Sequence, residues 1–383
     1  MLKIKKVSFP MLTIMACLVS AGCARSDAQT RSNGENDPRA QTGVESHSSA
    51  QGNMEDAMER FPASRFDLSN WSITIPLDLD GNGVADTIRA AEIQTYSHPD
   101  FFYLDENDRM VFTSPNKATT SPNSTNTRSE LRYESRGSDR SIAGSSPGNH
   151  FALASHENAD QFASIGSRME ATLQVDQVSL HAGHPQKPPA YSVVIGQIHS
   201  LSQDEKTNGF GYGNEPLKIF YKKWPEHETG SVFWAYERNL PTDDPNRTDI
   251  AYVAWGNNWD DTADPGDRGI ALGEVFSYTV NVHEDTLYLI FESETRGTVR
   301  HRINLSDNFD AHGNVDPADH PHGYAQESLY FKAGAYNQCS TSEADSWRYP
   351  ACPGTGDWET DRANGDFARA RFHRLVVSDS TPM

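Results

Sequence analysis

The sequence predicts an all-β sandwich on three observations. Short runs of β-branched and aromatic residues recur between positions 61 and 383, as is typical of strands. Glycine, proline, asparagine and aspartate separate these runs, as turns require. No long stretch keeps the 3.6-residue period of an amphipathic helix. The runs cover residues 71–75, 192–199, 217–221, 232–236, 276–282, 286–292 and 328–335.

The first 22 residues have the features of an export signal. Three lysines precede an apolar stretch that is too short to span a membrane. Ser-Ala-Gly-Cys, ending at Cys23, resembles the cleavage site of bacterial lipoproteins, so we expect residues 1–22 to be removed and Cys23 to be lipidated. An ordinary secretory signal is the alternative. Either reading predicts export, as an outer-membrane lipoprotein or as a secreted or periplasmic protein.

Residues 23–60 predict a flexible polar tether. This segment is rich in Ser, Asn, Gln, Gly, Glu and Asp, and it cannot bury enough apolar surface to offset the entropy of ordering. Residues 61–383 are long enough to bury a large core as one β domain. We therefore expect one folded domain, a monomer, whose contact with a membrane is through the N-terminal lipid alone.

The chain is acidic, with a formal net charge of −20. It has no run rich in lysine and arginine, which excludes nucleic acid as an expected partner. An acidic protein repels an anionic ligand at long range. Local basic groups would have to overcome that repulsion inside a groove whose low-dielectric walls focus their field.

Residues 330–338, Tyr-Phe-Lys-Ala-Gly-Ala-Tyr-Asn-Gln, are unlike a core strand. Side chains alternate between the two faces of a strand. One face then carries Tyr330, Lys332, Tyr336 and Gln338 around a glycine, while small apolar and aromatic residues face the other way. A cation, two phenols and an amide on one face indicate the floor of a polar groove.

Two other segments are built in the same way. Arg128, Glu130 and Arg132 share one face of a strand, and Gln197 and His199 share a face at the end of a β-branched run. Each segment alone also fits a solvated ion-pair ladder or a structural histidine. Three such strands in one chain favour a functional groove.

These blocks carry a family resemblance. Arg-Ser-Glu-Leu-Arg at 128–132, Gln-Ile-His at 197–199 and the block at 330–338 resemble, in this order, the three signatures of the alginate lyases of polysaccharide lyase family 7. The similarity runs from about residue 66 to residue 378. It implies a concanavalin-like β-jelly-roll with a groove on one sheet, and cleavage of alginate by β-elimination without a metal cofactor.

The resemblance also implies roles for single residues. Elimination removes the proton on C5 beside a carboxylate and protonates the leaving oxygen on C4, so preorganised donors must stabilise the enolate-like intermediate. The catalytic positions are Arg128, Gln197, His199 and Tyr336, with the first three as donors to the carboxylate, His199 as a donor or base, and Tyr336 as the acid. The substrate-binding positions are Glu130, Arg132, Lys218, Tyr330, Lys332 and Gln338. A solvated lysine is the alternative for Lys218.

Cysteine usage predicts one disulfide. The folded domain keeps only Cys339 and Cys352, which bracket a short loop after the block at 330–338. In an exported protein this pair is expected to be oxidised. The bond would contribute roughly 2–3 kcal/mol by restricting the unfolded chain.

A metal is not required by the expected chemistry, but one loop deserves comparison with calcium sites. Residues 78–86 place aspartate and asparagine at spacings like the start of a calcium loop. The bidentate glutamate expected at the twelfth loop position is absent, and Arg89 stands there. Structural calcium and a metal-free turn both fit this segment.

Three other functions would use parts of this pattern. A non-catalytic carbohydrate-binding sandwich would need neither the phenol acid nor the histidine. A glycoside hydrolase needs two carboxylates across the scissile bond, and the three groove strands offer only Glu130. A lyase for another polyuronate is opposed only by the family blocks. The sequence leaves open whether cleavage is internal or terminal, and whether mannuronate or guluronate is preferred.

Overall fold

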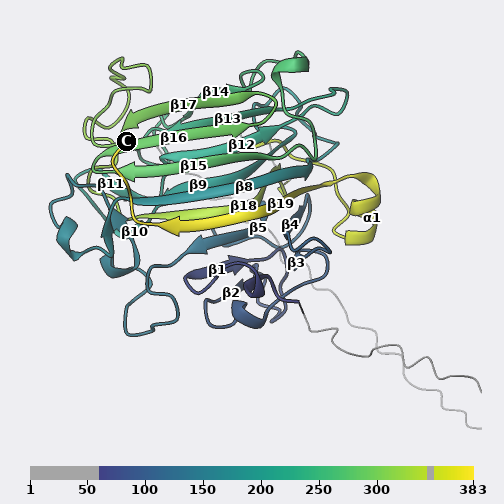
Figure 1. Cartoon of the computed structure of the whole chain (residues 1–383), viewed down its shortest axis with the longest axis horizontal. Helices are drawn as coiled ribbons and strands as arrows, with labels where there is room; N and C mark the ends of the chain where they lie inside the picture. Colours follow the sequence, from purple (N-terminus) through teal and green to yellow (C-terminus); the bar gives the residue numbers. More distant parts are fainter. Residues whose placement is uncertain (1–59, 343–348) are drawn as a thin grey trace, which may run out of the picture. The chain divides into compact units, whose positions relative to one another are not determined.

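Two large sheets lie one over the other in the computed structural model (Figure 1), which describes residues 60–342 and 349–383. The predicted all-β sandwich is confirmed. Within the described residues the only α-helix is α1 (Trp358–Asn364). Five short 3-10 turns are η1 (Pro62–Ser64), η2 (Ile93–Thr95), η3 (Pro147–Asn149), η4 (Ala159–Gln161) and η5 (Gly266–Arg268).

Sheet A is the sheet that carries the three blocks. Its strands are β1 (Trp71–Thr74), β2 (Thr87–Ile88), β5 (Asn126–Tyr133), β6 (Phe151–Ala152), β7 (Ser164–Ile165), β9 (Ser192–Ser200), β12 (Leu217–Lys222), β13 (Ser231–Glu237), β14 (Asp249–Trp255) and β18 (Leu329–Ser340). Their order is β14-β13-β12-β9-β18-β5-β1-β2; in addition, β6 pairs with β18, and β7 pairs with β6. All pairs are antiparallel except β6 with β7.

Sheet B covers the other side of the core. Its strands are β3 (Phe102–Leu104), β4 (Met110–Pro115), β8 (Ser167–Gln177), β15 (Phe276–His283), β16 (Thr286–Ser293), β17 (Gly297–Asn304) and β19 (Phe367–Ser378). Their order is β17-β16-β15-β8-β19-β4-β3. A separate hairpin is formed by β10 (Ser202–Thr207) and β11 (Phe210–Tyr212).

The core lies between the sheets because every second residue of each strand points inward. Leu131 and Phe331 of sheet A belong to the same apolar cluster as Phe112, Phe291 and Phe372 of sheet B, and all five are fully buried. Burying one such side chain contributes about 1.5–3 kcal/mol. The polar residues that alternate with them on sheet A are therefore directed to the outer face.

All seven runs predicted as strands are strands. The last of them is longer than expected, because β18 continues to Ser340. Two long strands of sheet B, β8 and β17, were not predicted. Both alternate charged with apolar residues, and their polar side faces outward, so neither contains a run of hydrophobic residues.

A second apolar cluster occupies part of the outer face of sheet A. Val194, Phe220, Phe233, Ala235 and Tyr336 are packed together there, each less than a tenth exposed. The ring of Trp259 lies 6.0 Å from the rings of both Phe220 and Phe233. This cluster fixes the phenol ring of Tyr336 from one side.

The predicted disulfide between Cys339 and Cys352 is confirmed, with the two Cα atoms 5.3 Å apart. It joins the last residues of β18 to the segment before α1. The export signal, the tether and Cys23 lie outside the described residues. None of the helices in the described part of the chain is long and apolar enough to cross a membrane.

Candidate active site

Strand pairing brings the three blocks together on the outer face of sheet A. β18 lies between β5 and β9, and β12 follows β9. Tyr336 is opposite Arg128, and Lys332 is opposite both Arg132 and Gln197. Directly opposed residues on neighbouring strands point to the same side of a sheet. The residues between them, including Leu131 and Ile198, belong to the core.

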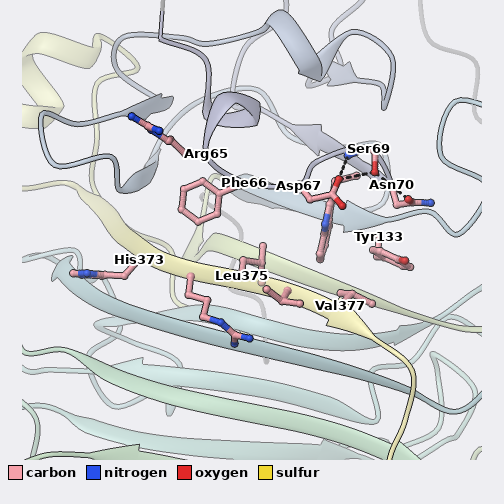
Figure 2. A pocket seen from close by; sticks show the side chains of 12 residues that line it. Arg65, Phe66, Asp67, Ser69, Asn70, Tyr133, His373, Leu375 and Val377 are labelled. Carbon is pink, nitrogen blue, oxygen red and sulfur yellow. Dashed lines mark hydrogen bonds between the residues drawn. The ribbon is translucent and has the colours of Figure 1, made fainter.

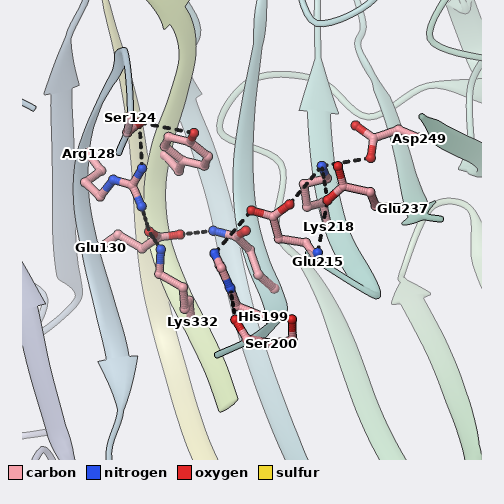
Figure 3. A network of polar contacts seen from close by, with 12 residues as sticks. Ser124, Arg128, Glu130, His199, Ser200, Glu215, Lys218, Glu237, Asp249 and Lys332 are labelled. Carbon is pink, nitrogen blue, oxygen red and sulfur yellow. Dashed lines mark hydrogen bonds and ion pairs between the residues drawn. The ribbon is translucent and has the colours of Figure 1, made fainter. Parts of the chain in front are cut away.

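His199 and Lys218 are part of the same arrangement. His199 is opposite Tyr330, and Lys218 is opposite Gln197. The four predicted catalytic residues, Arg128, Gln197, His199 and Tyr336, therefore lie on one face of one sheet, as the three-block pattern predicted. Figure 3 shows the polar contacts that connect this face.

Glu130 is the centre of these contacts (Figure 3). Its carboxylate accepts hydrogen bonds from Arg128 Nη1 at 3.2 Å, from Lys332 Nζ and from Gln197 Nε2. Glu130 is 2% exposed, and a buried carboxylate is tolerated when charged donors surround it. It orients three of the groups expected to meet the substrate. The carbonyl oxygen of Gln197 is buried without a hydrogen-bond partner.

Tyr336 is surrounded by cations. The guanidinium carbon of Arg128 lies 4.1 Å from the centroid of its ring, and Lys332 Nζ lies 5.8 Å from it. Ser124 connects the two catalytic side chains, because its hydroxyl accepts from Arg128 Nη2 at 2.9 Å and lies 3.4 Å from the phenol oxygen. These positive charges offset the negative charge that the phenol oxygen acquires when it gives up a proton.

His199 contacts an acceptor at each ring nitrogen. Nδ1 donates to the carbonyl oxygen of Ser200 at 2.6 Å, and Nε2 lies 3.2 Å from a carboxylate oxygen of Glu215. Carbonyl and carboxylate oxygens only accept hydrogen bonds, so both ring nitrogens of His199 face acceptors. The ring also stacks on Tyr330, with centroids 5.3 Å apart and planes 12° apart.

Glu215 belongs to a buried charge network that extends away from the catalytic residues (Figure 3). Lys218 Nζ lies 3.5 Å from Glu215, 2.8 Å from Asp249 and 3.9 Å from Glu237. Burial alone would raise the pKa of Glu215, but Lys218 and His199 hold it well below its usual range. Burial raises the pKa of Glu237 to about 8.

The solvated-lysine interpretation of Lys218 is wrong. This side chain is 1% exposed and is surrounded by three carboxylates, which raise its pKa against the effect of burial. A direct contact between Lys218 and a sugar stays a prediction. Its visible role is to balance the charge of Glu215 beside His199.

The other predicted substrate-binding residues occupy the two sides of this centre. The guanidinium of Arg132 lies 4.1 Å from the centroid of the Tyr330 ring, and Arg132 Nη2 lies 3.2 Å from His150 Nε2. Burial, then the charge of Arg128, lowers the pKa of Lys332 to about 8. Gln338 is buried and donates to the carbonyl oxygen of Tyr336 at 3.2 Å, so its side chain supports its own strand.

Three residues near this centre were not predicted from the sequence: Ser124, His150 and Glu215. His150 donates through Nδ1 to the carbonyl oxygen of Ser146 at 2.9 Å, and burial lowers its pKa to about 4. It is therefore neutral and can accept from Arg132. All three come from loops whose sequences carry no motif, and only strand pairing reveals their proximity.

The loop at 78–86 is satisfied by its own backbone. Asp78 accepts from the backbone N–H groups of Asn82 and Gly83, and Asp86 accepts from that of Leu79. In residues 60–342 and 349–383 no three His, Cys, Asp or Glu residues are grouped so that they could hold a metal. Calcium binding by this loop stays a prediction.

A cavity of about 230 Å³ lies elsewhere, between residues 65–71, Tyr133 and β19 (Figure 2). Its charged groups are already engaged. Arg65 pairs with Asp108 at 3.0 Å, Arg374 pairs with Glu170 at 3.0 Å, and Asp67 accepts from Ser69. It therefore offers an anionic sugar no unpaired arginine, unlike the outer face of sheet A.

Comparison with known proteins places this architecture in a family. The family model described as alginate lyase matches residues 66–379. An alginate lyase from Klebsiella pneumoniae is 33% identical over 295 residues, which are 75% of this chain and 87% of that protein.

Solved structures agree. The crystal structure of the alginate lyase from Klebsiella pneumoniae has a TM-score of 0.64 at 30% identity, and an exolytic family 7 alginate lyase from Zobellia galactanivorans has a TM-score of 0.65 at 31% identity. Each comparison covers 84% of this chain and 99% of the other. A more distant family 7 lyase, 19% identical, shares the fold with a TM-score of 0.52. The expected jelly-roll is confirmed by these neighbours, and the chain belongs to the alginate lyases of polysaccharide lyase family 7.

Proposed function

We propose that this alginate lyase cleaves the 1,4-linkage by β-elimination at the outer face of sheet A, leaving 4,5-unsaturated uronate ends. The observation that carries the proposal is the convergence of Arg128, Gln197, His199 and Tyr336 on that face. Donors to a carboxylate and a phenol beside two cations are the groups that elimination from a uronate requires.

Arg128, Gln197 and His199 neutralise the substrate carboxylate. The C5 proton becomes acidic only when the negative charge that develops on the carboxylate is stabilised. A guanidinium offers a planar fork of N–H groups for this purpose. The hydrogen bonds of Arg128 and Gln197 to Glu130 hold these donors in place before the substrate arrives, so little reorganisation is needed during the reaction.

Tyr336 supplies the proton transfers. Its phenol can protonate the leaving O4, and the adjacent Arg128 and Lys332 favour its use as a base in the preceding step. His199 is the alternative base. Its two ring nitrogens face a carbonyl and a carboxylate, which supports a role as a donor. We assign the base to Tyr336 because cations lie beside its ring, whereas both ring nitrogens of His199 already face acceptors.

A time course of ultraviolet absorbance with alginate tests the proposal. Elimination creates a conjugated C4–C5 double bond that absorbs, whereas hydrolysis does not. Tyr336→Phe should reduce the rate roughly 10²–10⁴-fold, the usual contribution of general acid–base catalysis. Tyr103→Phe, on β3 of the other sheet, is the control.

Two results would contradict the assignment. Unchanged activity of Tyr336→Phe would remove the tyrosine from the reaction. Absorbance that rises with another polyuronate and not with alginate would keep the chemistry and change the substrate. Separate runs with polymannuronate and polyguluronate measure the preference between the two uronates.

A specific observation favours cleavage from chain ends. The outer face of β12 and β13 is buried: Trp259 covers Phe220 and Phe233, and Lys222 Nζ donates to the carbonyl oxygens of Pro188 and Trp259 at 2.5 and 2.8 Å. A chain bound over β5, β18 and β9 could not continue across these strands. We therefore propose a groove closed on that side, in line with the exolytic relative from Zobellia galactanivorans.

A further inference from the structure

The outer face of sheet B carries two arginines that have no charged partner. Arg300 and Arg302 of β17 are exposed, and within the described part of the chain neither side chain makes a hydrogen bond or an ion pair, although their backbones pair with β16. Three other arginines on this sheet have a carboxylate partner: Arg168 pairs with Glu170 at 2.8 Å, Arg374 with the same carboxylate at 3.0 Å, and Arg371 with Asp176 at 2.8 Å. In a chain of net charge −20, two adjacent unpaired cations require an explanation.

Aromatic and apolar groups lie beside these cations. Tyr288 of β16 is directly opposite Arg302, and Ile290 is opposite Arg300. Phe309, in the loop after β17, is 44% exposed. Tyr288, Arg302 and Phe309 line a cavity of about 350 Å³ together with Asn304 and His312. β16 and β17 lie at one edge of sheet B (Figure 1).

The loop that forms one wall of this cavity is held in place by its own contacts. Asp310 accepts from the backbone N–H groups of His312 and Asn314 at 2.9 and 2.8 Å. Further along, Asp316 pairs with Arg238 at 2.7 Å. Asp310 also lines the cavity; both of these backbone N–H groups donate to its Oδ1, and Asn314 Nδ2 donates to its Oδ2 at 3.3 Å. The wall is therefore formed before any ligand binds, which lowers the entropic cost of binding.

We infer that this patch, formed by Tyr288, Arg300, Arg302 and Phe309, is a second, non-catalytic site for a segment of a uronate polysaccharide. Guanidinium groups bind carboxylates through paired N–H donors. Aromatic side chains provide an apolar face for the C–H surface of a sugar ring. The charge complementarity is local, because it opposes the sign of the rest of the protein.

The patch and the candidate active site lie on different sheets. The patch lies on the outer face of sheet B, and the candidate active site lies on the outer face of sheet A. One polymer network could therefore contact both, and a second contact raises the effective concentration of substrate at the first. This site goes beyond the proposed reaction, and it would exist even if the assigned catalytic roles were wrong.

Binding of the full-length protein to alginate, measured by calorimetry, tests the site. The background is the double variant Arg128→Ala/Lys332→Ala, in which the groove of sheet A is weakened and the polymer is not consumed. We expect residual binding in this background, and we expect Arg302→Ala to weaken it about tenfold or more, which corresponds to about 1.4 kcal/mol. Tyr288→Ala should weaken it as well.

Arg374→Ala is the matched control, since Arg374 is an arginine of the same sheet that already has a carboxylate partner. It should leave the residual binding unchanged, and thermal melting verifies that each variant is folded. Residual binding that is insensitive to Arg302→Ala, or that is absent in the background variant, overturns the inference. Equal competition by a neutral glucan overturns the assignment to uronates.

Discussion

At the scale of single residues, two carboxylates organise the candidate site, the buried Glu130 and the partly buried Glu215. Glu130 holds Arg128, Lys332 and Gln197, and Glu215 lies against His199. Buried charges are tolerated only when they are paired, and removing one partner leaves the other uncompensated. The positions and charges of the catalytic groups therefore depend on residues that need not touch the substrate.

Glu215→Gln should lower kcat more than it raises KM, because an amide oxygen accepts a weaker hydrogen bond from His199 Nε2 than the carboxylate does. A hydrogen bond to a charged group contributes about 1.5–3 kcal/mol, so a loss of roughly 10–150-fold is expected. Steady-state kinetics with alginate measure both constants. Glu215→Asp should restore part of the activity. An unchanged kcat in Glu215→Gln would contradict the role assigned to Glu215.

Lys332 predicts a pH dependence of substrate binding. Its pKa of about 8 lies below the ordinary value of 10.5, so above about pH 8 the side chain loses the charge that attracts a uronate. KM for alginate should rise as the pH passes through this value. Lys332→Arg keeps its charge and should remove the rise, while Lys117→Arg, away from the groove, should retain it. A KM that does not change between pH 7 and pH 9.5 would argue against this prediction.

At the scale of the element, β18 depends on a glycine. Gly334 has φ of +147°, and a Cβ atom there would lie 2.5 Å from the carbonyl oxygen of Ser129 and 2.8 Å from the Cα atom of Glu130. The register of β18 against β9 shifts between Ala333 and Tyr336. Gly334 therefore permits the close approach of β5 and the irregularity that directs Tyr336 to the outer face.

Gly334→Ala should lower the free energy of unfolding by about 2 kcal/mol or more, since an overlap with backbone atoms cannot be relieved by rotating a side chain. Activity should fall as well, because β18 also carries Tyr336. The control is Gly148→Ala, where an added Cβ meets only ordinary contacts; it should change stability by less than about 0.5 kcal/mol. Chemical unfolding measures the free energy of unfolding of both variants. Equal stability of the two variants would show that β5 and β18 can separate without cost.

At the scale of the whole molecule, the covered face of β12 and β13 predicts how the polymer is degraded. If chains enter from their ends, double bonds should accumulate while the viscosity of an alginate solution falls slowly. Simultaneous measurement of absorbance and viscosity separates this from internal cleavage, in which viscosity collapses after few cuts. An early collapse would mean that the polymer crosses β12 and β13 after all, or that it lies along the strands.

The sequence by itself determined much of this protein, because its information is local. Period-two alternation located the strands and assigned Arg128, Gln197, His199 and Tyr336 to one kind of face, and cysteine usage predicted the disulfide. The resemblance in three blocks named the family. Each strand and each block is recognised from residues that are neighbours in the sequence, and the two cysteines are only 13 positions apart.

Only the tertiary structure decided how these faces are completed. Ser124 reaches Tyr336 across 212 positions, and Gln197 reaches Glu130 across 67. The burial of Lys218 among three carboxylates, the pairing of Glu215 with His199 and the unpaired arginines of β17 likewise depend on which strands become neighbours. Pairing between distant strands is set by the packing of the whole core, so the charge state and the accessibility of a side chain follow from contacts that its own segment does not encode.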